Sequence, residues 1–200
     1  MQKSKNPLLR LQYNSPVILT FAIFSTVVLL LSSITDGSSN TFLFMVYRSS
    51  FTDPLAYIRV FTHAIGHANF DHFLNNFLMI LLVGPMLEEK YGSKSLIIMI
   101  IVTAFVTGIV HLVTSSGAML GASGIVFMLI LLSSFTNIQK GRIPLTLILA
   151  LALFIGREII SSVTTDTNIA HLAHIIGGIC GASFGFFLNK SFYKGGKNGV

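Results

Sequence analysis

A serine between small residues is the strongest chemical feature of this sequence. Ser123 lies in Gly121-Ala122-Ser123-Gly124, at the start of an apolar stretch. Such a stretch does not need a hydroxyl between two glycines in order to pack as a helix, so the segment calls for a catalytic explanation. A serine hydroxyl is a weak nucleophile until a neighbouring base takes its proton. The sequence must therefore supply a base that reaches Ser123.

His174 is the predicted base. It lies six residues into the last apolar stretch, about 9 Å deep at the helical rise of about 1.5 Å per residue. Gly178, Gly181 and Gly185 follow on the same helical face, which lets a neighbouring helix approach closely. No Asp or Glu in this stretch can orient the imidazole, so the prediction is a Ser-His dyad. Similar small-residue stripes also occur in membrane proteins that catalyse nothing.

His72 and Asn76 are candidates for stabilising charge during the reaction. They lie four residues apart and share one helical face. Side-chain donors in a dry site, together with the backbone N–H of Ser123, would stabilise the oxyanion that forms when a serine attacks a carbonyl. The alternative is a structural pair that forms hydrogen bonds across helices.

Histidines elsewhere raise the question of a metal. His63 and His67 precede His72, but no His-Glu-x-x-His motif and no clustered acids accompany them. Histidines in that setting favour hydrogen bonding over zinc. We therefore predict no metal and no cofactor. The single Cys180 excludes an intramolecular disulfide.

The composition indicates an integral membrane protein. Of the 200 residues, 52% are hydrophobic and only 10% are charged, against about 25% charged residues in soluble domains. Most of the apolar stretches approach the length of about 20 residues that spans a bilayer. There are six, at residues 16–34, 72–87, 96–113, 123–137, 144–163 and 168–188. The prediction is an all-α membrane protein with six transmembrane helices.

Cationic residues predict the orientation of these spans, because Lys and Arg bias their segments toward the cytoplasm. The opposite set of loops carries only Arg48 and Arg59. Both termini are therefore predicted to be cytoplasmic, and Ser123 and His174 to lie toward the same, external side. The net charge of +6 is explained by this pattern, without nucleic acid as a partner. The cytoplasmic set comprises Lys3, Lys5, Arg10, Lys90, Lys94, Lys140, Arg142, Lys190, Lys194 and Lys197.

The chain is predicted to form one domain. A helical unit over residues 16–189 is flanked by short cytoplasmic tails, residues 1–15 and 190–200. The external connection at residues 35–71 is long for a passive loop and rich in aromatic residues. Long connections of this kind are usually structured or functional, and aromatic rings favour the membrane interface.

Four motifs in this order resemble the rhomboid family of intramembrane serine proteases, over residues 59–188. The first is Arg59-Val60-Phe61-Thr62-His63-Ala64, which is similar to the end of the family's first loop. The others are His72-x-x-x-Asn76, Gly121-Ala122-Ser123-Gly124 and His174-x-x-Gly177. The resemblance implies the minimal six-helix bacterial form, a multi-pass protein of the plasma membrane.

The resemblance also implies roles for single residues. Ser123 would be the nucleophile and His174 the general base, since His171 lacks a glycine three residues later. His72, Asn76 and the Ser123 amide would form the oxyanion site. Residues implied to support the site are Gly121, Gly124, Phe127, Gly177, Gly178, Arg59 and Glu88.

Two positions depart from the family pattern. Phe127 stands where many members have Tyr, and Ile58 where many have Trp. A ring that supports the imidazole by stacking does not need its hydroxyl, so activity is expected to persist.

The implied reaction is hydrolysis of peptide bonds in or near transmembrane segments through an acyl-enzyme. The partners would be transmembrane protein substrates and the lipid bilayer. Two alternatives remain. One is an inactive rhomboid-like protein that binds transmembrane clients, and the other is a small transporter that uses histidines for protons.

Overall fold

The computed structural model describes residues 12–50, 52–135 and 168–195, and the isolated positions 145, 148, 149, 152, 153 and 156. These residues form helices, with one isolated β-bridge. The elements are α1 (Pro16–Ile34), η2 (Asn40–Phe44), α2 (Pro54–Thr62), η3 (His63–Ile65), α3 (Phe70–Tyr91), α4 (Ser93–Thr114), α5 (Ser123–Phe135) and α7 (Asn168–Gly195).

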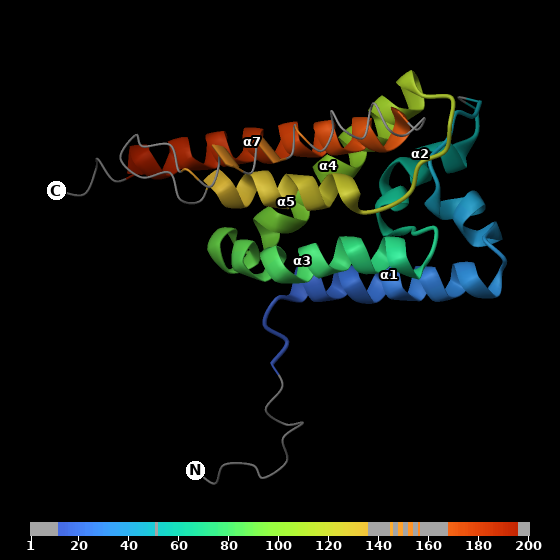
Figure 1. Ribbon diagram of the computed structural model, residues 1–200, viewed down its shortest axis with the longest axis horizontal. Coiled ribbons are helices and arrows are strands. Elements are labelled where there is room, and N and C mark those ends of the chain that lie inside the picture. The colour runs from blue at the N-terminus through green and yellow to red at the C-terminus, as the bar shows by residue number, and fades with distance from the viewer. Residues whose placement is uncertain are drawn as a thin grey trace, which may run out of the picture.

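α1, α3, α5 and α7 lie along one common direction, whereas α2 and α4 run obliquely to them (Figure 1). α1 packs beside α3, and α5 packs beside α7 with the two running the same way. α2 and the loop before α5 lie at the right-hand end of Figure 1, whereas the turn between α3 and α4 lies toward the left. The end that holds α2, the start of α5 and the start of α7 therefore contains the residues predicted to do chemistry.

The predicted spans are confirmed as helices wherever the structure describes them. α1 has the predicted bounds, and α3, α4, α5 and α7 contain or closely follow the other predicted stretches. α1, α3 and α4 are long and apolar enough to cross a membrane, whereas Ser123–Phe135 and Leu172–Leu188 are shorter apolar segments. The predicted stretch 144–163 lies largely outside the described residues, and the sidedness of the termini stays a prediction.

Local sequence signals explain where the helices begin and end. α2 begins at Pro54 after Asp53, whose carboxylate accepts a hydrogen bond from Leu55 N–H (3.0 Å). Asn69 caps α3 in the same way by accepting from His72 N–H (2.8 Å). α3 ends at Tyr91 and is capped by Gly92, whose φ of +80° favours glycine, and α4 starts at the next residue.

Glu88 joins α1 to the turn between α3 and α4. Its buried carboxylate accepts hydrogen bonds from Val17 N–H (2.9 Å), Ile18 N–H (3.1 Å) and the Ser93 hydroxyl (2.7 Å). The first N–H groups of a helix have no partner within the helix, and a carboxylate also suits the positive end of the helix dipole. Glu88 therefore has a structural role, at the end of the bundle remote from Ser123.

Replacing Glu88 with Ala is expected to lower the free energy of unfolding by about 2–4 kcal/mol, because three donors lose their acceptor. Thermal unfolding of the purified protein in detergent measures this change. Glu89→Ala is the matched control, since Glu89 is exposed on the next position of the same helix. Equal midpoints for the two variants would contradict the capping role.

Candidate active site

The segment before Ser123 is held by the connection between α1 and α3. Val46 and Met119 form an antiparallel bridge through two backbone hydrogen bonds, of 2.9 and 2.8 Å. Gly121 N–H then donates to the His63 carbonyl (2.9 Å). Gly121 has a φ of +125°, a conformation that side chains rarely permit. These contacts fix the backbone at the point where Ser123, half-buried, begins α5.

His72 and Asn76 lie against this segment, as their spacing predicts. A Cβ placed on Gly121 would lie 2.7 Å from His72 Nε2 and 3.7 Å from Asn76 Nδ2. Asn76 is 7% exposed, and its Nδ2 has no hydrogen-bond partner. A buried, unpaired donor is costly to maintain. It is therefore available for a group that enters beside Ser123.

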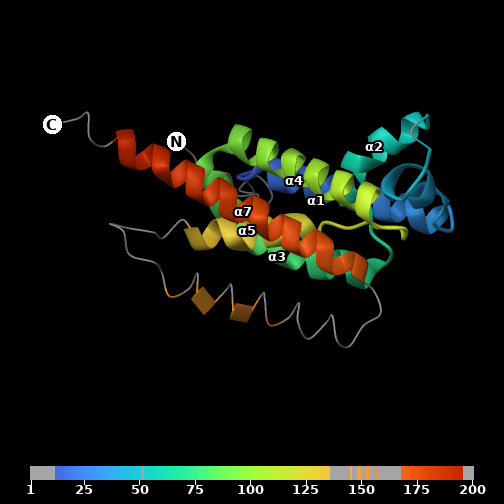
Figure 2. The same cartoon turned by 90° about the horizontal axis from the view of Figure 1, so that it is seen from above.

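α7 approaches the start of α5 until their backbones touch. A Cβ on Gly177 would lie 2.0 Å from the Gly124 carbonyl oxygen, which leaves room only for glycine. The backbones approach as closely one turn later, where Gly181 meets the Met128 carbonyl, and after a second turn Gly185 packs against the Phe135 side chain. The two helices lie side by side in both Figure 1 and Figure 2. The stripe in contact with α5 is thus Gly177, Gly181 and Gly185.

The sequence analysis predicted that Gly178, Gly181 and Gly185 form the face of this helix that approaches its neighbour. The observed stripe shares Gly181 and Gly185 with that prediction. Gly178 is also buried. The backbone contact with Gly124 nevertheless belongs to Gly177.

The His174 ring rests on the ring of Phe127. Their centroids are 4.4 Å apart and their planes are inclined by 43°. Phe127 is 6% exposed and lies four residues after Ser123, on the same face of α5. The imidazole therefore lies beside the α5 face that carries Ser123. The side chain of His171, the rival base, lies outside the described residues.

The other histidines have structural contacts. His63 Nε2 lies 3.0 Å from the Ala104 carbonyl, and burial lowers the His63 pKa to about 4. His67 lies edge-on to His72, at 5.1 Å between ring centroids, and burial followed by the His72 charge lowers its pKa to about 4. His111 Nε2 lies 2.9 Å from the Gly117 carbonyl. Within the described ranges, no three His, Cys, Asp or Glu side chains are grouped to hold a metal ion.

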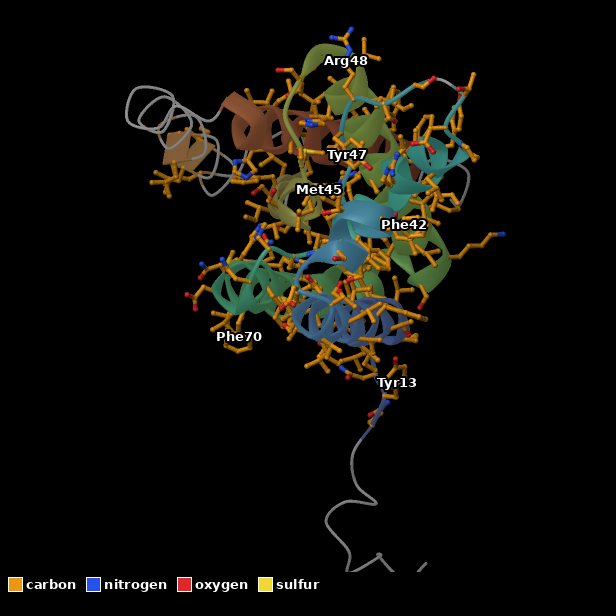
Figure 3. All side chains as sticks on the ribbon, turned by 90° about the vertical axis from the view of Figure 1, so that its right-hand side faces the viewer. Tyr13, Phe42, Met45, Tyr47, Arg48 and Phe70 are labelled. Atoms are coloured by element: carbon orange, nitrogen blue, oxygen red, sulfur yellow. The ribbon has the colours of Figure 1, made fainter. Side chains whose placement is uncertain are left out.

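Arg59 holds the connection between α1 and α3 in shape. It is 2% exposed, pairs with Asp53, and donates to the Tyr47 hydroxyl (2.8 Å). Its guanidinium also lies 4.3 Å from the centre of the Tyr47 ring. Figure 3, which looks onto this end of the bundle, shows Tyr47 and Met45 near its centre. Because Val46 lies between them, this network supports the bridge to Met119.

The pKa of Asp53 is lowered within this network. Desolvation acts to raise it, but the Leu55 N–H bond and the hydrogen bond and charge of Arg59 outweigh that effect. The carboxylate therefore stays ionised opposite Arg59. The sequence analysis identified Arg59 but missed its partners Asp53 and Tyr47. The acidic residue six positions before Arg59 was the signal that could have indicated an ion pair.

Comparison with known proteins agrees with this arrangement. The family model for the Rhomboid domain matches residues 54–191, which include every predicted site residue. The chain is also 27% identical over 135 residues to Rhomboid protease GlpG of Haemophilus influenzae. That alignment covers 66% of this chain and 70% of the relative. The chain belongs to the rhomboid family.

Proposed function

We propose that this protein is an intramembrane serine endopeptidase that uses a Ser123–His174 dyad. The observation that carries the proposal is the junction of α5 and α7, where Gly177 meets Gly124 and His174 packs on Phe127. The junction supports the proposal because the His174 ring lies against Phe127, on the α5 face that also carries Ser123. Family membership and the relative described as a rhomboid protease support the same reaction.

In the first half of the proposed reaction, His174 takes the proton of the Ser123 hydroxyl as Oγ attacks the substrate carbonyl. The carbonyl oxygen becomes an oxyanion, which accepts hydrogen bonds from His72, Asn76 Nδ2 and the Ser123 N–H. His174 then gives its proton to the departing amine, and an acyl-enzyme on Ser123 remains. In the second half, His174 takes a proton from water as the water oxygen attacks the acyl carbonyl. The bond from that carbon to Ser123 Oγ then breaks, His174 returns the proton to Oγ, and the acid product leaves. No cofactor enters this sequence.

Phe127 has a supporting role in this scheme. Its ring limits rotation of the His174 imidazole without titrating itself. The Tyr hydroxyl that many family members carry at this position is not required for either proton transfer. The departure at Ile58 concerns the membrane interface, because that side chain is 47% exposed and lies next to the buried Arg59.

The substrates we propose are transmembrane proteins. A substrate helix uses its carbonyls in its own hydrogen bonds, so it must unwind before Ser123 can attack. Small or helix-breaking residues near the external end of a single span therefore suit this site. In this proposal residues 16–189 form one catalytic unit of a multi-pass plasma-membrane protein. Residues 1–15 and 190–200 are its cytoplasmic tails.

Replacing Asn76 with Ala is expected to lower kcat by about 100-fold, the cost of removing one donor to an oxyanion. The measurement is steady-state cleavage of a single-span substrate in detergent. Asn75→Ala is the matched control, because Asn75 is exposed on the neighbouring position. An unchanged kcat in Asn76→Ala would leave this side chain with a structural role only.

The experiment that tests the function places the purified chain in liposomes with a single-span substrate. The expected result is cleavage near the external end of the substrate span, with both fragments identified by mass spectrometry. A second substrate, with its helix-breaking residues replaced by Leu, is expected to remain intact. Binding of the first substrate without cleavage would favour the inactive client-binding protein. Proton flux without cleavage would favour the transporter.

A further inference from the structure

An apolar groove of about 540 Å³ lies between α1 and α4, away from Ser123. Thr20 and Ser93 are its only polar lining residues among those the structure describes. The exposed side chains Phe24, Ile97 and Ile101 are 58%, 44% and 47% exposed, so the groove opens outward. In a membrane protein this opening faces lipid.

The length of the groove matches one leaflet of a bilayer. Along α4 it reaches from Ser93 to Ala104, a rise of about 17 Å, and one leaflet contributes about 15 Å of hydrocarbon. Phe61 stacks on Phe105, with 5.3 Å between the ring centroids, and borders the end of the groove that Ala104 lines. The apolar lining and this length suit a lipid acyl chain.

Polar groups gather at the other end of the groove. The Tyr13 hydroxyl lies 2.9 Å from the Thr20 hydroxyl, and Figure 3 shows Tyr13 on the outer side of α1. Tyrosine favours the interface between lipid and water. Lys94 is exposed and follows Ser93 on the α4 face that also carries Ile97 and Ile101. A cation and a hydroxyl thus stand where the headgroup of a lipid in the groove would lie.

The exposed Lys94 gives this end of α4 a positive charge, next to Ser93 of the groove lining. The carboxylate of Glu88, the buried acid nearby, already accepts hydrogen bonds from two N–H groups of α1 and from the Ser93 hydroxyl. Glu88 and the exposed Glu89 line a separate cavity with Gly92.

We propose that the groove binds one anionic phospholipid. Its acyl chain lies between Phe24 and Ile97, and its phosphate lies against Lys94 and the Tyr13 hydroxyl. The apolar walls hold any acyl chain, and the basic end selects an acidic headgroup over a neutral one. This proposal is independent of the protease assignment.

The absence of tryptophan from the chain allows a direct test. Phe24→Trp places a single fluorophore in the groove, and Ile23→Trp is the matched control at the neighbouring exposed position outside it. Each full-length variant is reconstituted in phosphatidylcholine vesicles. The vesicles contain a small fraction of phosphatidylglycerol or phosphatidylcholine brominated in the middle of its acyl chain. Quenching by the two brominated lipids is then compared.

For Phe24→Trp the apparent association with brominated phosphatidylglycerol is expected to exceed that with phosphatidylcholine by about fivefold, the contribution of one lysine at an anionic surface. Ile23→Trp is expected to show no preference. Adding Lys94→Gln to Phe24→Trp is expected to remove the preference while quenching by phosphatidylcholine persists. Equal quenching of Phe24→Trp by both lipids would overturn the proposal, as would a preference unaffected by Lys94→Gln.

Discussion

Replacing Ser123 with Ala, or His174 with Ala, is expected to reduce cleavage of a single-span substrate by about 10⁴-fold or more, as loss of a nucleophile or its base does in other serine proteases. Without the hydroxyl there is no acyl-enzyme. Without the imidazole the hydroxyl keeps its proton. The two losses are expected to be similar, and the double variant to be no worse than either, because the residues act as a unit.

The measurement is single-turnover cleavage in detergent at saturating substrate. Ser133→Ala is the control on the same helix, since Ser133 lies ten residues further along α5 and its hydroxyl donates to the Ile130 carbonyl. Thermal unfolding verifies that each variant is folded. Cleavage near the wild-type rate in folded Ser123→Ala protein would refute the nucleophile. The same result in His174→Ala would refute the base.

Gly177→Ala is expected to reduce cleavage by about 100-fold, because displacing catalytic groups by about 1 Å has an effect of that size. The added Cβ would lie 2.0 Å from the Gly124 carbonyl oxygen, so α7 must move away from α5 and carry His174 with it. Overpacking of this kind also lowers stability, by about 1–3 kcal/mol.

Gly156→Ala provides the matched control, because a Cβ on that helical glycine meets nothing within 4 Å. Cleavage rate and thermal midpoint are measured for both variants. The Gly177 variant is expected to lose activity even at temperatures where it remains folded. If Gly177→Ala retained full activity, the backbone contact would not set the position of His174.

The elements that carry the site could be predicted because they depend on residue types at fixed spacing. Pro16 marks the start of α1, and the spacing of His72 and Asn76 places both on one helical face toward Gly121. Phe127 could be paired with His174 because the resemblance placed a ring one turn after Ser123. The two ring centroids lie 4.4 Å apart in the structure, and the supporting role of Phe127 stays a prediction.

Contacts made by the backbone could not be predicted in the same way. The bridge between Val46 and Met119 and the bond from Gly121 N–H to the His63 carbonyl use groups that every residue carries. No pattern of side-chain types marks them. The choice of Gly177 over Gly178 likewise depends on how α7 crosses α5, and a glycine-rich sequence permits several crossings.

The extent of α7 also exceeded the prediction. The helix continues beyond the apolar stretch to Gly195, through Asn189 and Lys190. Hydropathy marks the part of a helix that lies in hydrocarbon, whereas backbone hydrogen bonding continues into the aqueous side. The apolar stretch therefore predicts the span but not the end of the helix.

Covalent labelling with a fluorophosphonate probe tests the central claim most directly, because the probe reacts with a serine only when a base activates it. Phosphorus bonds to the serine oxygen, fluoride leaves, and the serine proton passes to the base. The account predicts one labelled peptide, modified at Ser123, with labelling lost in His174→Ala and strongly slowed in Gly177→Ala. Labelling at another serine, or undiminished labelling of Ser123 in folded His174→Ala protein, would contradict it.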